Sequence, residues 1–250
     1  MIDLSLLLAL SVGLLLSSVL NRVIIRLPLE RGLGGWLHCT RCARPLAWWQ
    51  FIPIVGWAAQ RGRASCCGKP LHWVHPLIDL IGTLSICWLY LRYGLSPLFF
   101  YLTIVAVVLL VTGAIDWLHR WIFTYIVLGG AAIVLSASPF VRPHNLMNAL
   151  LGLIVAGFIF ALFFFLARIL FPAHGAPFGL GDVYLAMFLG AAFGITRLGP
   201  VLFAGMLLAG IFSIGVIVLR ALGRSTPTYI SYGTFLCIGA LGVLLLRGLS

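Results

Sequence analysis

The sequence predicts an all-α integral membrane protein with about eight transmembrane helices and a small cysteine-bearing cytoplasmic domain between the first two. Of its 250 residues, 62% are hydrophobic and 8% are charged, whereas a soluble domain is about 45–50% apolar and about 25% charged. Each span needs roughly 20 apolar residues, and a helix satisfies its own backbone polar groups in lipid. The net charge of +11 resides mostly between the apolar runs, which indicates a membrane surface rather than nucleic acid as the partner.

Eight apolar runs carry the helical prediction. The sixth is short, and only a few residues separate the third from the fourth. The predicted spans lie near residues 4–24, 75–95, 97–116, 121–140, 148–171, 182–196, 198–220 and 232–248. Basic residues follow the first run instead of preceding it, so we expect an uncleaved span rather than a signal peptide. The predicted organisation is therefore a first helix (1–24), a cytoplasmic cysteine-containing domain (25–74) and a seven-helix membrane domain (75–250).

The basic residues predict the orientation. If the polar segment 25–74 is cytoplasmic, alternation of the spans places twelve of the 16 Lys and Arg residues on the cytoplasmic side and four on the other. This asymmetry satisfies the positive-inside rule. We therefore expect the N-terminus outside, and the turn at 117–120 and the loop at 172–181 on the cytoplasmic face.

Acidic residues are rare, and two of them suggest catalysis. The chain has five acids, and a carboxylate within a span costs roughly 2.5–3.5 kcal/mol, so it needs a functional explanation. Asp116 ends the third predicted span and Asp182 opens the sixth, which puts both at the cytoplasmic ends of their helices. Two facing carboxylates share one proton. One can then activate water while the other protonates a scissile carbonyl, as in aspartic proteases.

Other interpretations of these residues remain. An isolated membrane aspartate is often a helix cap or an interhelical hydrogen-bonding group, which is the favoured interpretation of Asp79. A proton-coupled carrier would also contain intramembrane acids, but near mid-membrane and in broken helices. Before Asp182, Gly179 and Gly181 let the backbone approach an extended peptide closely, so we expect them to bind substrate. The helix N-terminus beside Asp182 favours its ionised form.

Four of the six cysteines suggest a metal site. Two others, Cys87 and Cys237, fall in apolar spans and are expected to be small buried hydrophobic residues. In a cytoplasmic segment stable disulfides are disfavoured, and four thiolates suit a closed, structural zinc site. The expected ligands are Cys39, Cys42, Cys66 and Cys67. The alternatives are a histidine, His38 or His72, in place of Cys66, or a metal-free loop packed by Trp48, Trp49 and Trp57.

The Gly-Leu-Gly-Asp at 179–182 is similar to the Gly-x-Gly-Asp motif of intramembrane aspartyl proteases. The wider chain resembles the bacterial type IV prepilin peptidases (prepilin leader peptidases), collinearly over nearly its whole length. The segments that carry the resemblance are SSVLNRVIIRLP (17–28), the cysteine segment (39–71), HPLIDL (75–80), AIDWLHRWIFTYI (114–126), GLGDVYLAMFLGAAFG (179–194) and SYGTFLCIGAL (231–241).

The resemblance implies an eight-span enzyme of the bacterial inner membrane. Such an enzyme cleaves the basic leader from prepilins or pseudopilins on the cytoplasmic face, with Asp116 and Asp182 as catalytic residues. Many members also N-methylate the new N-terminus using S-adenosylmethionine. The expected partners are these substrates and the lipid bilayer, with no nucleic acid, and the oligomeric state stays open.

The chain departs from the family pattern at several positions, none of which removes a catalytic acid. The family usually has Leu-Pro-Asp where this chain has Ile-Phe-Thr at 122–124. Thr234 stands where proline is usual, and Tyr184 where lysine is common. Ala64 occupies the first cysteine position of the second Cys-x-x-Cys pair, with Cys66 as an extra neighbour of Cys67.

Overall fold

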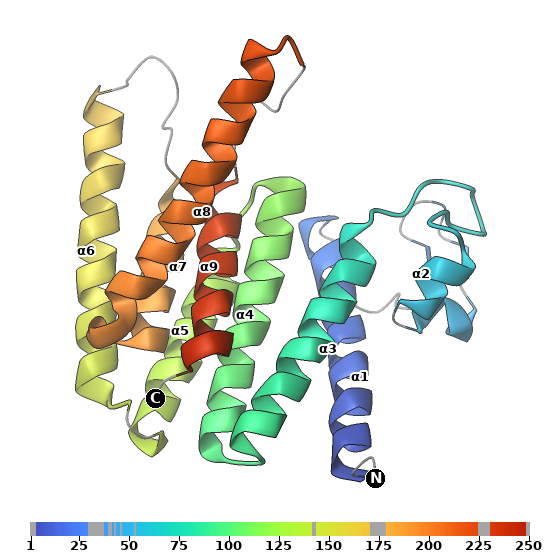
Figure 1. The fold of residues 1–250 in the computed structure, drawn as a ribbon, viewed down its shortest axis with the longest axis horizontal. Coiled ribbons are helices and arrows are strands. Elements are labelled where there is room, and N and C mark those ends of the chain that lie inside the picture. The colour runs from blue at the N-terminus through green and yellow to red at the C-terminus, as the bar shows by residue number, and fades with distance from the viewer. Residues whose placement is uncertain are drawn as a thin grey trace. The chain divides into compact units, whose positions relative to one another are not determined.

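The protein is described by a computed structural model, which defines residues 4–29, 38–39, 42, 44–45, 47–52, 54–141, 144–170, 179–224 and 231–248. In these residues all regular structure is helical (Figure 1). The β-type pairing found there consists of two isolated antiparallel bridges, His38 with Pro45 and Arg63 with Pro70. The all-α prediction is confirmed.

Eight apolar helices and one short helix account for this fold. They are α1 (Leu4–Arg26), the short α2 (Val55–Ala59), α3 (Val74–Tyr93), α4 (Pro97–His119), α5 (Thr124–Ala137), α6 (Leu146–Leu170), α7 (Leu180–Phe193), α8 (Ile195–Ala221) and α9 (Tyr232–Arg247). Helices α1, α3, α4, α6 and α8 are long and apolar enough to cross a membrane, whereas α5, α7 and α9 are apolar but shorter. The eight predicted spans therefore all form helices, and the cysteine segment lies between the first two of them.

The chain forms two compact units, residues 1–95 and 96–250. In the first unit α1 packs along α3, and a buried polar contact joins the two helices. The Asn21 side-chain amide donates to the Asp79 carboxylate at 3.2 Å and to the His75 carbonyl at 2.9 Å. Asp79 is 6% exposed. It therefore makes the interhelical hydrogen bond that was the favoured interpretation of this residue.

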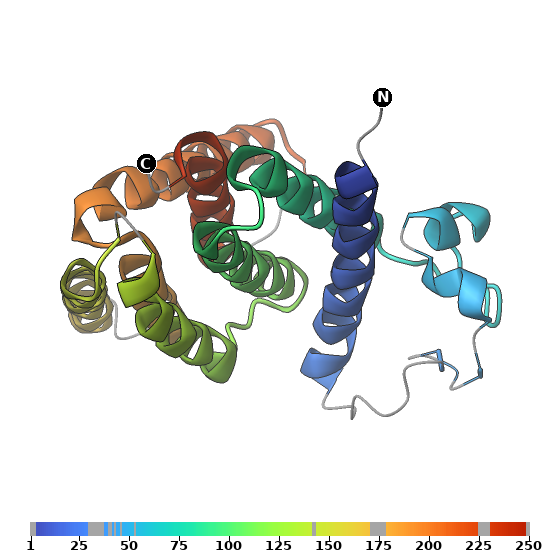
Figure 2. The same cartoon turned by 90° about the horizontal axis from the view of Figure 1, so that it is seen from below.

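The second unit contains α4 to α9, with α6 packed most extensively against α7. Figure 2 shows α6 almost end-on, with α7 beside it. A Cβ atom on Gly152 of α6 would overlap the carbonyl oxygen of Gly190 of α7, and the converse overlap also holds. Only glycine lets the two backbones approach this closely, and small residues are the usual means of such packing in membranes.

Helix α4 runs further than its apolar run suggested. It continues three residues past Asp116 to His119 and ends at Arg120, whose backbone is left-handed (φ 58°, ψ 36°). A non-glycine residue there is uncommon and marks a sharp change of chain direction. Asp116 therefore lies inside the last helical turn, where its side chain can be buried, instead of at the helix end.

Candidate active site

Asp116 belongs to α4, but its side chain lies at the N-terminus of another helix, α9. The residue is 6% exposed. Its Oδ2 accepts the backbone N–H of Thr234 at 2.7 Å and lies 2.9 Å from the Thr234 hydroxyl oxygen. Thr234 is the third residue of α9, where backbone N–H groups have no partner within the helix. Asp116 therefore caps α9, whose dipole stabilises a negative charge at this point.

Asp182 occupies an equivalent place on its own helix. It is the third residue of α7 and is partly buried. Its Oδ2 accepts the backbone N–H of Gly179, the residue that precedes the helix, at 3.2 Å. Each acid therefore lies at the positive end of a short apolar helix, which lowers the cost of a carboxylate in apolar surroundings.

Ile122, in the turn between α4 and α5, contacts the neighbours of both acids. A Cβ on Gly181 would lie 2.8 Å from the Ile122 Cβ, and a Cβ on Gly233 would lie 2.9 Å from its Cδ1 and 3.1 Å from the Asp116 Oδ2. One side chain thus contacts the first turns of both α7, which carries Asp182, and α9, which Asp116 caps, so the fold brings the two aspartates of separate helices to the same part of the unit.

The structure explains one of the two predicted substrate-binding glycines as a packing residue. Gly181 faces Ile122 with no room for a side chain. A Cβ on Gly179 would make only ordinary contacts, with the Asp182 carboxylate at 3.5 Å and the Gly181 backbone nitrogen at 3.8 Å. Residues 172–178 of the expected loop lie outside the described part of the chain. A role of Gly179 and Gly181 in binding a peptide therefore stays a prediction.

Sequence reasoning missed two residues of this site. Thr234 was noted only as a departure from a pattern, and Ile122 only as part of a changed tripeptide. Both act through contacts between elements far apart in the chain: 118 residues separate Thr234 from Asp116. No local spacing signal connects such residues.

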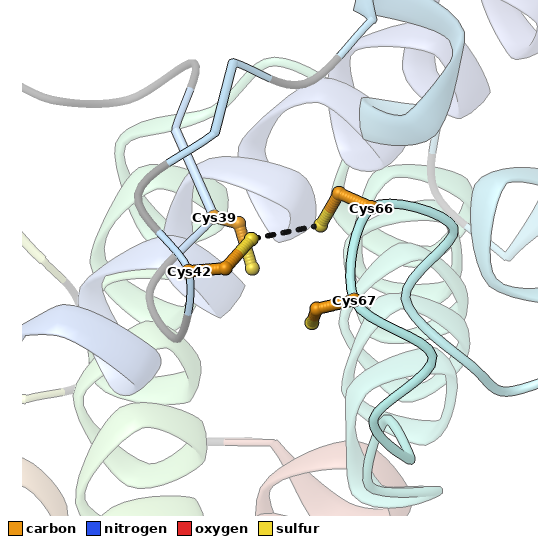
Figure 3. A group of neighbouring side chains, drawn as sticks. All are labelled: Cys39, Cys42, Cys66 and Cys67. Carbon is orange, nitrogen blue, oxygen red and sulfur yellow. Dashed lines mark hydrogen bonds between the residues drawn. The ribbon is translucent and has the colours of Figure 1, made fainter.

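The four cysteines expected to bind metal converge in the first unit (Figure 3). Their sulfur atoms all lie within 4.8 Å of one another, and the Sγ atoms of Cys42 and Cys66 are 3.3 Å apart. All four are free thiols. Tetrahedral zinc with Zn–S bonds of about 2.3 Å separates its sulfurs by roughly 3.8 Å, so one ion fits this cluster with small adjustments.

Two similar hairpins present these thiols. In the first, the Cys39 N–H donates to the Arg44 carbonyl at 2.8 Å, and in the second the Ala64 N–H donates to the Lys69 carbonyl at 2.9 Å. Ala64 therefore occupies the place in the second hairpin that Cys39 occupies in the first, and both are buried. The thiol missing at position 64 is replaced by that of Cys66, two residues along.

The pKa of the Cys66 thiol is raised by its surroundings. Desolvation, followed by hydrogen bonds with the thiols of Cys42, Cys39 and Cys67, raises the pKa of Cys66 to about 12. Crowded thiols cannot all ionise without a cation among them, and metal binding must displace their protons. Four thiols placed together in this way could hold one metal ion.

Comparisons with known proteins identify two family models in this chain. Residues 11–93 match the Bacterial Peptidase A24 N-terminal domain, and residues 103–214 match the Type IV leader peptidase family. The chain is 33% identical to a Myxococcus xanthus protein, over 86% of this chain and 63% of that protein's length. It is 29% identical to a Pseudomonas putida protein, over 92% of this chain and 87% of the relative.

A Bacillus subtilis protein is 26% identical over 86% of this chain and 84% of its own length. All three relatives carry the name prepilin leader peptidase/N-methyltransferase. The chain spans less than two thirds of the Myxococcus protein, but more than four fifths of the other two. No solved structure matches the chain.

Proposed function

Because the chain belongs to the type IV leader peptidase family, we propose that it is a membrane aspartic endopeptidase that removes the basic leader peptide from type IV prepilins or pseudopilins. The observation that supports this proposal is the placement of Asp116 and Asp182 around one side chain, that of Ile122. Each acid lies at a helix N-terminus, and Ile122 packs against Gly181 beside one acid and Gly233 beside the other. The two family matches together cover more than half of the chain.

The chemistry follows from two acids that share one proton. Like charges at close range disfavour double ionisation, so one acid is ionised and the other neutral. The ionised carboxylate takes a proton from water, and the water oxygen forms a bond to the carbonyl carbon of the scissile peptide. The carbonyl oxygen receives the proton of the neutral acid. Collapse of this tetrahedral intermediate, with protonation of the leaving nitrogen, breaks the peptide bond.

We propose that cleavage occurs at the cytoplasmic face of the inner membrane. The distribution of basic residues, twelve against four, supports an outside N-terminus and a cytoplasmic cysteine domain. A basic leader would then be drawn to an ionised acid, with the peptide passing Gly179 and Gly181. The division into a first helix (1–24), cysteine domain (25–74) and peptidase domain (75–250) belongs to this proposal.

The carrier hypothesis has less support. A carrier would hold its acids near mid-membrane in interrupted helices. Asp116 lies in the last turn of α4 and Asp182 in the first turn of α7. Both positions lie within one turn of a helix end and not in the middle of an interrupted helix.

We propose zinc as a structural ion bound by Cys39, Cys42, Cys66 and Cys67. The mutual distances of the four sulfurs support this, and four thiolates leave no open position for a catalytic water. The ion would hold the two hairpins together, because a segment this short cannot build a sufficient hydrophobic core of its own.

A cavity in the first unit supports N-methylation as a second function. Its volume is about 180 Å³, and Asp79, Arg22, Arg26 and Trp57 are among its lining residues. A carboxylate and two guanidinium groups complement the amino and carboxyl groups of S-adenosylmethionine, and an aromatic ring can face its sulfonium cation. The volume suits that end of the molecule rather than the whole. When bound, the cofactor would supply the methyl group for the new N-terminal amine.

Binding of S-adenosylmethionine to the purified protein tests the second function without relying on catalysis. We expect Asp79→Asn to weaken binding in equilibrium dialysis while leader cleavage continues. Equal binding by the variant and the parent protein would exclude this cavity as the site.

Processing of a co-expressed prepilin tests the protease. We expect Asp116→Asn and Asp182→Asn each to leave the precursor at its unprocessed size, since the asparagine side chain neither takes the proton of water nor donates one as an acid. Asp79→Asn serves as the control and should process the substrate. Full processing by either of the first two variants would remove that residue from catalysis.

A further inference from the structure

We infer that Thr234 is a positioning residue that keeps Asp116 in its ionised form, so that Asp116 acts as the base on water and Asp182 holds the shared proton. This assignment of roles rests on the proposed proteolysis. It is drawn from the unequal hydrogen bonding of the two acids.

The contacts of Asp116 favour its charge. One carboxylate oxygen, Oδ2, has two donors from Thr234 within reach, the backbone N–H at 2.7 Å and the hydroxyl at 2.9 Å. Asp116 and Thr234 are 6% and 5% exposed. Hydrogen bonds to an ionised group are roughly twice as strong as neutral ones, and burial strengthens them further.

Asp182 receives less support for a charge. Among the described residues, its hydrogen-bond donor is the backbone N–H of Gly179, at the longer distance of 3.2 Å. Gly179 is exposed, so water competes for this contact. Of two carboxylates that share one proton, the one with more and shorter donor contacts stays ionised. The proton therefore resides on Asp182.

The Thr234 hydroxyl also fits the change that catalysis imposes on Asp116. A hydroxyl has one proton to donate, and the Gly113 carbonyl is a second acceptor at 3.1 Å. While Asp116 is ionised, the hydroxyl donates to it. Once Asp116 has taken a proton from water, the hydroxyl can turn to Gly113, so it does not oppose the step that it prepares.

The pH dependence of cleavage distinguishes this role from simple packing. Thr234→Val keeps the shape of the side chain and the backbone N–H. We expect it to move the low-pH limb of the kcat/KM profile to higher pH by about one unit, because a carboxylate with one donor fewer ionises at higher pH. Thr234→Ser should retain the limb of the parent protein. Thr234→Pro lacks both donors and lies in the first helical turn, where proline is tolerated, so its limb should move further.

Thr112→Val is the matched control. Its hydroxyl is buried on α4, four residues before Asp116, and finds no hydrogen-bond partner among the described residues. The same substitution there should leave the limb in place. Thr234→Ala provides the same test as valine if the valine variant does not accumulate in the membrane.

An unchanged or lowered low-pH limb in an active Thr234→Val enzyme would overturn this inference, as would an equal shift in Thr112→Val. That outcome would leave the protease proposal intact as long as Asp116→Asn and Asp182→Asn are inactive. Full activity of those two variants would instead overturn the protease proposal itself.

Discussion

At the scale of single residues, Asp116 and Asp182 solve the same problem in the same way. A carboxylate in a membrane helix costs roughly 2.5–3.5 kcal/mol, and each of these lies where a helix N-terminus offers free N–H groups and a positive dipole. Thr234 supplies these groups to Asp116 from α9, and Gly179 supplies one to Asp182 from its own chain segment. Each acid is therefore stabilised by backbone N–H groups at a helix N-terminus.

A substitution at Gly181 tests whether its close contact with Ile122 positions Asp182. In Gly181→Ala, the new Cβ would lie 2.8 Å from that of Ile122, so one of the two segments must shift. We expect the start of α7 to move and to carry Asp182 with it. A misplacement of about 1 Å can cost on the order of 100-fold in rate, and we expect a loss of 10-fold or more in prepilin cleavage.

Gly129→Ala on α5 is the control for that experiment, because its Cβ would meet no atom within 4 Å. It should cleave at the rate of the parent protein. Wild-type kinetics in Gly181→Ala would show that the close contact with Ile122 does not position the acid.

At the scale of elements, the two cysteine hairpins are the clearest repeated structure. Equivalent hydrogen bonds close them, one from Cys39 to Arg44 and one from Ala64 to Lys69. The sequence was enough to predict which four cysteines converge, since they are the cysteines of the polar segment. It left open whether a histidine replaces Cys66, and the sulfur positions favour Cys66 because all four thiols lie within 4.8 Å.

The hairpin equivalence predicts that the fourth ligand can be moved. Cys66→Ser should lower bound zinc, measured by mass spectrometry of the metal in purified protein. Adding Ala64→Cys to that variant should restore it, because position 64 corresponds to Cys39 in the other hairpin. Cys87→Ala, in the buried part of α3, should keep the metal. Undiminished zinc in Cys66→Ser would exclude this cysteine as a ligand.

At the scale of the whole molecule, hydropathy predicted all eight apolar helices because each lies in a run of apolar residues that is punctuated by polar turns. It could not predict that α4 extends past Asp116 to His119, because the helix ends at Arg120, whose backbone is left-handed, and not where the apolar run ends. Asp116 and Asp182 were identified as candidate catalytic residues because a carboxylate within a membrane span has a high free-energy cost. Thr234 and Ile122 were not identified as site residues, because their roles exist only after distant helices pack.

The orientation of the chain is also a property of the whole molecule. Alkaline phosphatase needs disulfides that form outside the cytoplasm, so its fusions report which side a segment occupies. We expect activity for fusions after Gly94 and none after Gly68 or Gly223. An active fusion after Gly68 would place the cysteine hairpins outside and contradict cytoplasmic cleavage.

The central claim is that Asp116 and Asp182 act as one catalytic unit. Cleavage rates of Asp116→Asn, Asp182→Asn and the double variant, measured on one purified prepilin, test it most directly. Residues that act as a unit are strongly non-additive, so the double variant should be no slower than either single variant, and all three should have lost nearly all activity. Independent losses that multiply in the double variant, or substantial activity in either single variant, would contradict the claim.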